Sequence, residues 1–203
     1  MVVFYIFFIL FIRKEKIILY FLSTWCYNRI DYLYIGVLCL MIILGIDPGY
    51  AIVGFGVVGY SNNKLTPIEY GAITTPAHTK TEYRLSEIYD GICELCEKFK
   101  PDAISIEELF FNSNAKTAVN VCQARGVILL AATRHGIPIF EYTPLQIKQS
   151  VTGYGRAEKH QIIAMVTTLL GLKNPPKPDD TADALAAAIC HGYSSSSMLF
   201  NLK

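Results

Sequence analysis

Apolar and polar residues alternate along the chain in a way that predicts ten elements after Met41. Short apolar runs bounded by turn residues predict strands over 42–47, 53–58, 68–74, 103–107 and 138–142. Helical periodicity predicts helices over 82–98, 115–134, 145–150, 157–170 and from 179 to about 191. Short turns join the first three strands, and helices separate the later ones. This order predicts an α/β fold, a mixed five-stranded sheet with its first three strands antiparallel and helices on both faces.

Residues 1–40 have a different pattern, rich in Phe, Ile, Tyr and Leu. Charged and polar residues interrupt the apolar runs at 13–16 and 28–31, so no run reaches the roughly 18–20 residues of a membrane helix. The apolar run also comes first, unlike the basic start of a signal peptide. Because Met41 opens a self-sufficient strand, we expect 1–40 to be a mis-assigned start or disordered, with an interfacial or membrane anchor as the alternative.

The remaining chain predicts one domain over 41–193 and a flexible tail over 194–203, without a membrane segment. The whole chain has 18 basic and 17 acidic side chains, and the part from Met41 on is near neutral. Residues 109–178, however, contain eight Lys and Arg but only two acidic residues, Glu141 and Glu158. A local positive excess of this kind is typical of a surface that binds a polyanion.

The six cysteines indicate little specific chemistry. Cys93 and Cys96 form the single C-x-x-C pair, which lacks the second pair or histidines of a zinc site. We expect them to be core thiols of a protein in the reducing cytoplasm.

Four acidic residues carry the clearest chemical signal. Asp47 and Glu107 each end an apolar strand, and Asp180 and Asp183 begin an alanine-rich helix. Acids at the ends of core elements are expected to converge, and buried carboxylates are unfavourable unless a cation compensates them. The pattern therefore predicts a hard divalent metal site.

Each acid also has a simpler explanation. Asp47 precedes Pro48-Gly49 and fits a turn, and Glu107 or Glu108 fits a solvated strand end. Asp179 and Asp180 fit a helix N-terminus. Asp183 is harder to explain in this way, because it shares a face with Asp180 among small alanines that allow close approach to the sheet.

The motifs together resemble the RuvC family of Holliday-junction resolvases, which has the ribonuclease-H-like fold. The resemblance covers the chain from Met41 to about Gly192 and none of 1–40. It rests on Ile-Leu-Gly-Ile-Asp-Pro-Gly (43–49), Ile-Glu-Glu-Leu-Phe (106–110), Gln-Ala-Arg-Gly (123–126) and Ala-Asp-Ala-Leu-Ala (182–186). It selects Glu107 over Glu108, a choice that periodicity leaves open.

The resemblance implies a crossover junction endodeoxyribonuclease of recombination and DNA repair. Its catalytic and metal-binding residues would be Asp47, Glu107, Asp180 and Asp183, holding two Mg²⁺ ions, with Mn²⁺ as a substitute. Such enzymes nick two strands symmetrically and leave 5′-phosphate and 3′-hydroxyl ends. The implied partners are four-way junction DNA, a second copy of the chain, and a branch-migration helicase of the RuvA and RuvB type.

The same resemblance indicates DNA contacts. Phe110 is the candidate for stacking on an unpaired base, although ordinary core packing is expected for one of Phe110 and Phe111. Lys148 and Lys159 match basic positions that the family uses on phosphates, and Lys116 is a further candidate DNA contact. Arg156, in the turn between Lys148 and Lys159, could join them, with solvated surface charge as the alternative. For the homodimer we expect contacts through Val119, Gln123 and Val127 of the long helix.

Two other classes of protein fit part of the pattern. Sugar kinases and actin-like ATPases share a first strand of this type, but they need a second glycine-rich phosphate loop and a much longer chain. A catalytically idle junction-binding protein is the other alternative, and the presence of all four acids argues against it.

Overall fold

The computed structural model describes residues 7–13, 16–22, 40–109 and 115–200, and the chain divides into two compact units, Met1–Leu40 and Met41–Lys203. In the first unit β1 (Phe7–Arg13) and β2 (Lys16–Leu22) pair antiparallel. Apolar runs rich in aromatic and β-branched residues favour such strands. That residues 1–40 are a mis-assigned start or disordered stays a prediction, as does a translation start at Met41.

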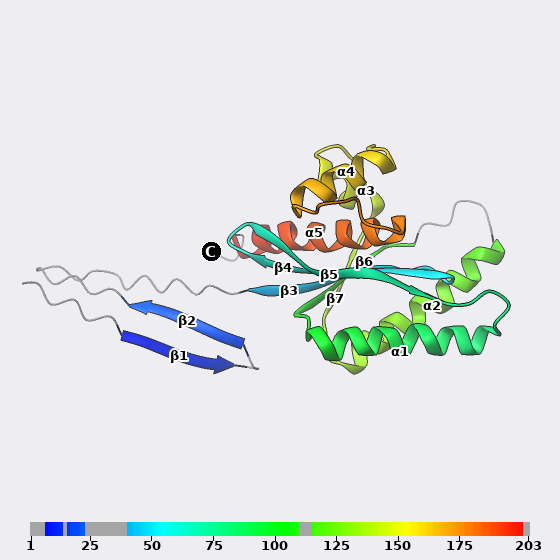
Figure 1. The fold of residues 1–203 in the computed structure, drawn as a ribbon, viewed down its shortest axis with the longest axis horizontal. Helices are drawn as coiled ribbons and strands as arrows, with labels where there is room; N and C mark the ends of the chain where they lie inside the picture. Colours follow the sequence, from blue (N-terminus) through cyan, green and yellow to red (C-terminus); the bar gives the residue numbers. More distant parts are fainter. Residues whose placement is uncertain (1–6, 14–15, 23–39, 110–114, 201–203) are drawn as a thin grey trace, which may run out of the picture. The chain divides into compact units, whose positions relative to one another are not determined.

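The second unit contains the elements that the sequence predicts (Figure 1). They are, in chain order, β3 (Met41–Asp47), β4 (Ile52–Ser61), β5 (Lys64–Thr74), α1 (Thr81–Phe99), β6 (Ala103–Glu107), α2 (Ala115–Arg134), β7 (Ile139–Tyr142), α3 (Pro144–Thr152), α4 (Lys159–Leu169) and α5 (Asp179–Phe200).

The five strands form one mixed sheet in the order β5-β4-β3-β6-β7. Strands β3, β4 and β5 are antiparallel neighbours, whereas β6 is parallel to β3 and β7 is parallel to β6. This confirms the predicted topology. Strand β3, which ends at Asp47, is the middle strand of the sheet.

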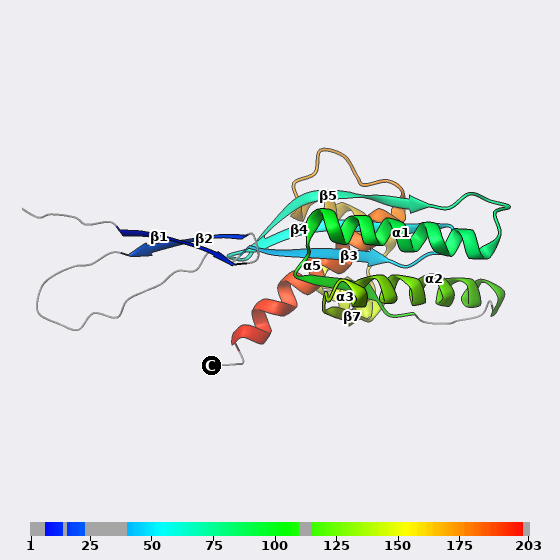
Figure 2. The ribbon, with the colours of Figure 1, turned by 90° about the horizontal axis from the view of Figure 1, so that it is seen from below.

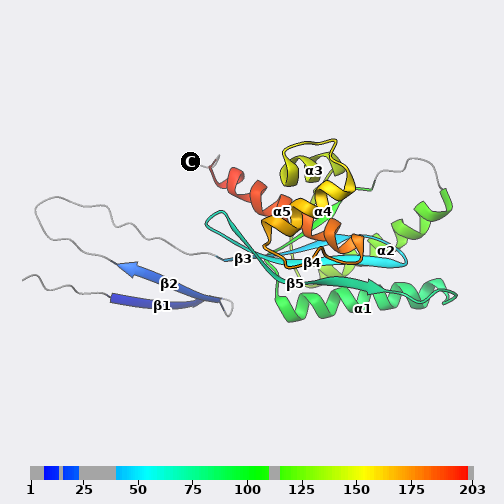
Figure 3. The ribbon, with the colours of Figure 1, turned by 45° about the horizontal axis from the view of Figure 1, so that its top comes forward.

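Helices cover both faces of this sheet. In Figures 1 and 2, α1 and α2 lie side by side on one face, and α3, α4 and α5 lie on the other. Figure 3 shows α3 and α4 beside α5, the helix that contacts the central strands. The side chains of β3 alternate between the two cores, with Ile43 in the core under α5 and both Leu44 and Ile46 in the core under α1 and α2.

The β4–β5 connection is a tight hairpin. Asn62 and Asn63 have φ angles of 50° and 59°, a left-handed conformation that asparagine tolerates and that tight hairpin turns require. The sequence correctly predicts a turn at 61–64, but both strands continue up to it, because the register pairs Ser61 with Lys64.

The boundaries of several helices differ from the prediction, and those of α4 and α5 have identifiable causes. Helix α4 begins at Lys159, and the backbone N–H of Glu158 in front of it donates a hydrogen bond to Oε1 of Gln161 at 2.8 Å. Helix α5 continues to Phe200, so the prediction that it ends near His191 is wrong, and the tail expected over 194–203 is helical up to Phe200. The hydroxyls of Ser194 and Ser195 donate to the carbonyl oxygens of Cys190 and Gly192, which lets serines continue the helix.

Across the described residues, none of the helices combines the length and the apolar character needed to cross a membrane.

Candidate functional site

Asp47 is the last residue of the central strand β3. Its partner in the antiparallel register is Gly54 of β4, and the chain between them turns through Pro48 and Gly49. A Cβ atom at Gly49 would overlap the carbonyl oxygen of Ile52, so only glycine fits this close turn. The strand end and the tight turn together fix where Asp47 leaves the sheet.

Glu107 ends strand β6, which lies parallel to β3. The register pairs Ile46 with Ile106, so the residues that follow each of them, Asp47 and Glu107, lie at the same edge of the sheet. The carboxyl ends of adjacent parallel strands are a common place for active sites in α/β proteins. The two strand-end acids therefore come together as the sequence predicts.

Asp180 and Asp183 lie in the first turns of α5, which packs closely on β3 and β4. A Cβ atom at Gly54 would overlap the carbonyl oxygen of Asp180, and one at Gly45 would overlap that of Ala184. Three strand glycines (Gly45, Gly54 and Gly56) thus allow α5 to approach the sheet.

Two hydroxyl groups anchor α5 to the sheet. Thr181 donates a hydrogen bond to the carbonyl oxygen of Gly71 at 3.0 Å, and Ser105 donates one to that of Ala187 at 2.7 Å. Thr181 and Ser105 are both fully buried, so their polar atoms need these partners. The anchors hold the acidic end of α5 over the strand ends.

The pKa of Asp47 shows that the four acids share one environment. Burial, the largest cause, and the negative charges of Asp183, Glu107 and Asp180 together raise it from 3.8 to about 7, against a lowering by Lys159. The pKa of Glu107 is also raised, by burial and then by Asp183, while Lys148 and Lys159 lower it. A cluster of this kind is unfavourable without a compensating cation.

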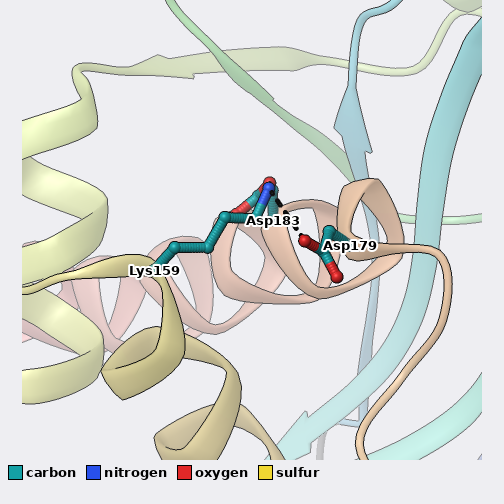
Figure 4. Close-up of polar contacts among 3 residues, drawn as sticks. All are labelled: Lys159, Asp179 and Asp183. Atoms are coloured by element: carbon teal, nitrogen blue, oxygen red, sulfur yellow. Dashed lines mark hydrogen bonds and ion pairs between the residues drawn. The ribbon is translucent and has the colours of Figure 1, made fainter.

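Lys159 forms ion pairs with two acids of α5 (Figure 4). Its Nζ atom donates a hydrogen bond to Oδ2 of Asp183 at 2.9 Å and lies 3.8 Å from Oδ2 of Asp179. Burial lowers the pKa of Lys159, but the hydrogen bond and charge of Asp183, with Asp179 and Asp180, produce a net rise. Lys159 therefore stays charged and partly neutralises the cluster.

The chemistry of the donor set fits a hard divalent cation, because all four candidate ligands are carboxylates. Among the described residues, no group of three or more His, Cys, Asp or Glu side chains is already arranged around a common metal position. Lys159 occupies part of the position of a cation, because it donates a hydrogen bond to Asp183. A cation would supply the charge that draws these side chains together.

The predicted DNA contacts fall into two groups. Lys148 of α3, Lys159 of α4 and the exposed Arg156 between these helices lie on the side of the sheet that carries α5. Lys148 is close enough to lower the pKa of Glu107. Phe110 lies outside the described residues, as does the side chain of Lys116, whose backbone belongs to α2.

Two contributions to the site were not predicted. Asp179 was expected only to cap the helix, whereas it also lies near Lys159. Gly54 was given no role, although the alternation of glycine along Gly54-Phe55-Gly56 is a signal for close approach by another backbone.

Comparison with known proteins identifies the family. The model of the family described as "Crossover junction endodeoxyribonuclease RuvC" matches residues 43–191. The chain belongs to the RuvC family. RuvC of Clostridioides difficile is 57% identical over 155 residues, which cover 76% of this chain and 92% of the relative. RuvC of Ruminiclostridium cellulolyticum is 62% identical over 154 residues, which cover 76% and 93%.

Solved RuvC structures have the same architecture. The structure of Thermus thermophilus RuvC superposes with a TM-score of 0.72 at 35% identity, covering 77% of this chain and 97% of that one. The same protein in complex with a Holliday junction substrate gives a TM-score of 0.74 at 34% identity, covering 78% and 96%. Membership of the RuvC family, with this sheet topology, confirms the predicted ribonuclease-H-like fold and decides against the ATPase alternative.

Proposed function

We propose that the chain is a metal-dependent endonuclease that resolves Holliday junctions in recombination and DNA repair. The observation that carries this function is the convergence of Asp47, Glu107, Asp180 and Asp183 at one edge of the sheet, in a chain of the RuvC family. The similarity to a RuvC solved with a Holliday junction substrate supports four-way junction DNA as the substrate.

The proposed cofactor is Mg²⁺, two ions for each site, with Mn²⁺ as a substitute. The ligands would be the four carboxylates, whose oxygen atoms suit hard cations. When bound, divalent ions activate a water for in-line attack on the phosphodiester and stabilise the leaving oxygen. The water oxygen bonds to phosphorus as the bond to the 3′ oxygen breaks, which leaves a 5′-phosphate and a 3′-hydroxyl.

The side chains of the protein position this chemistry. Asp47 lies where three other carboxylates raise its pKa, so its ionised form is stabilised when a cation binds and is then available as a ligand. Lys159, which lowers the pKa of Asp47 and Glu107, and Lys148, which lowers that of Glu107, would meet phosphate oxygens beside the acids. Arg156 and Lys116 would extend the phosphate contacts, and Phe110 would stack on a base at the crossover.

We also propose that the protein works as a homodimer, because two symmetric nicks need two identical sites. On α2, Val119 and Leu130 are 57% and 48% exposed, and Cys122, Gln123 and Gly126 are exposed between them. These five residues, the outer α2 face, follow helical spacing along one side. Val127 was predicted to join the contact, but it packs on the core formed with α1.

The dimer would act in the cytoplasm beside a branch-migration helicase of the RuvA and RuvB type. The thiols of Cys93, Cys96, Cys122 and Cys190 are free, which suits the reducing compartment expected from the sequence.

A direct experiment incubates the full chain with a synthetic four-way junction and with a linear duplex of the same sequence. Nicking of the junction with Mg²⁺, and none with a chelator or on the duplex, is the expected result. Equal nicking of both substrates would point to a nonspecific nuclease. Absence of nicking with either metal, on junctions of varied sequence, would contradict the proposal.

A further inference from the structure

The turn that follows Asp47 is held by a side chain from a distant helix. Arg84 of α1 donates from Nη2 to the carbonyl oxygen of Tyr50 at 3.2 Å. Its guanidinium carbon lies 3.9 Å from the centre of the Tyr50 ring, within the range of a cation–π contact. Arg84 therefore contacts both the backbone and the ring of Tyr50, which lies three residues after Asp47.

The same guanidinium reaches the end of β5. Nε of Arg84 donates to the hydroxyl of Thr75 at 2.8 Å, and that hydroxyl donates to the carbonyl oxygen of Tyr50 at 2.9 Å. The backbone N–H of Thr75 donates to the carbonyl oxygen of Ala51 at 3.0 Å. Thr75 is 7% exposed, so these bonds form in a largely water-excluded position.

A further hydrogen bond joins Tyr50 to the start of α1. The hydroxyl of Tyr50 donates to that of Thr81, the first residue of α1, at 3.0 Å. The turn is thus clamped between the end of β5 and the first turns of α1. Because Gly49 already lies against the carbonyl of Ile52, the turn has little room to adjust without moving Asp47.

We propose that Arg84 is a positioning residue for Asp47, which holds the turn so that the Asp47 carboxylate can share a metal with the other acids. This role rests on the proposed function of the site. Arg84 suits it because its planar fork donates in two directions while its face stacks on an aromatic ring, which a lysine cannot reproduce. The contacts of Arg84 with Tyr50 and Thr75 would preorganise the metal ligand Asp47 before any cation or DNA binds.

The test compares Arg84→Met with Lys98→Met in the full chain. Lys98 lies in the last turn of the same helix and pairs with the exposed Glu69, so its replacement removes an equal charge away from the turn. The first readout is the Mg²⁺ concentration that half-maximally raises the melting temperature of the DNA-free protein. For Arg84→Met it should rise about 10-fold, as for other residues that orient metal ligands, whereas Lys98→Met should match the wild type.

Cleavage kinetics provide a second readout. Arg84→Met should lower kcat on saturating junction by about 10- to 100-fold, with KM and the junction affinity in chelator within about twofold of the wild type. Arg84→Lys, which keeps the charge and a single donor group, should give an intermediate loss. A purely structural role would instead lower the melting temperature and leave the metal midpoint and kcat of the folded fraction unchanged.

The proposal is overturned if Arg84→Met and Lys98→Met have the same metal midpoint and kcat. If Arg84→Met does not fold, Thr75→Val removes the hydroxyl that joins Arg84 to the turn and should shift the metal midpoint in the same direction. An unchanged midpoint in that variant would also overturn it. Failure of the proposed function can be distinguished from failure of this proposal, because the wild type itself would then not cleave junctions.

Discussion

Gly54 lies directly beneath the backbone of Asp180, and a Cβ atom at Gly54 would overlap the carbonyl oxygen of that residue. Gly54 is also the register partner of Asp47 in the neighbouring strand. The absence of a Cβ atom at Gly54 therefore allows the acids of α5 to lie close to Asp47. The geometry of the site depends on this backbone contact as much as on the carboxylates themselves.

Gly54→Ala should push the start of α5 away from the sheet. We expect a loss of about 1–3 kcal/mol in the free energy of unfolding, typical of an overpacked core, and loss of metal-dependent cleavage in the folded fraction. Gly71→Ala in β5 is the matched control, because its Cβ would meet only the ring edge of Phe55 at 3.2 Å. Urea unfolding and junction cleavage measure both effects, and equal behaviour of the two variants would contradict the contact.

The raised pKa of Asp47 predicts how the metal-free protein depends on pH. In the unfolded chain this carboxyl titrates near 3.8, and in the folded protein near 7, so the folded state binds more protons between these values. The contribution of Asp47 to stability is therefore lost as pH rises from about 4 to about 7. In chelator, Asp47→Asn should flatten this decline, and Mg²⁺ should offset it in the wild type.

Urea unfolding of both proteins across this pH range is the measurement. Asp90→Asn, at an exposed position of α1, is the control and should retain the decline seen in the wild type. If Asp47→Asn also retained it, the four acids would not form one buried cluster.

Lys159 competes with a cation for Asp183, to which it donates a hydrogen bond at 2.9 Å. Lys159→Met should lower the Mg²⁺ concentration needed to stabilise the DNA-free protein, because the competing charge is gone. It should also weaken junction binding and reduce its salt slope by about 1, since a phosphate contact is lost. The exposed Lys173, outside the acid cluster, gives the control variant Lys173→Met. If Lys159→Met left the Mg²⁺ midpoint and the salt slope unchanged, Lys159 would neither compete with the cation nor contact a phosphate.

The outer α2 face predicts a cross-link between two copies of the chain. If the dimer forms through this face, a short bis-maleimide should join the exposed Cys122 of one copy to that of the other. Cys122→Ser should abolish the product, and Val119→Glu with Leu130→Glu should abolish the dimer in size-exclusion chromatography. A dimer that survives both glutamates would place the interface elsewhere.

The sequence predicted those parts of the fold that depend on local pattern. Strand β6 and helix α2 begin and end at the predicted residues, because Asp102 and Asn112–Asn114 interrupt the apolar pattern in front of them. The strand-end acids were also predictable, since burial of the strand fixes where its last residue emerges. Helix α5 was predicted too short, because its serines bond to their own helix rather than ending it.

Contacts between residues far apart in the sequence could not be predicted in this way. Arg84 reaches Tyr50 across 34 positions, and no periodicity marks either residue as a partner. The pairing of Lys159 with Asp183 likewise depends on how α4 and α5 pack. The sequence therefore predicts which side chains carry the proposed chemistry, and the packing shows which residues contact the elements that carry them.

The most direct test of the account is strand-specific mapping of nicks on a four-way junction by the wild type and by Asp47→Asn. The account predicts paired nicks at symmetric positions on two strands in the wild type, sealed by DNA ligase, which requires 5′-phosphate and 3′-hydroxyl ends. Asp47→Asn should bind the junction with similar affinity and leave it uncut. Full cleavage by Asp47→Asn, or unpaired nicks that ligase cannot seal, would contradict the central claim.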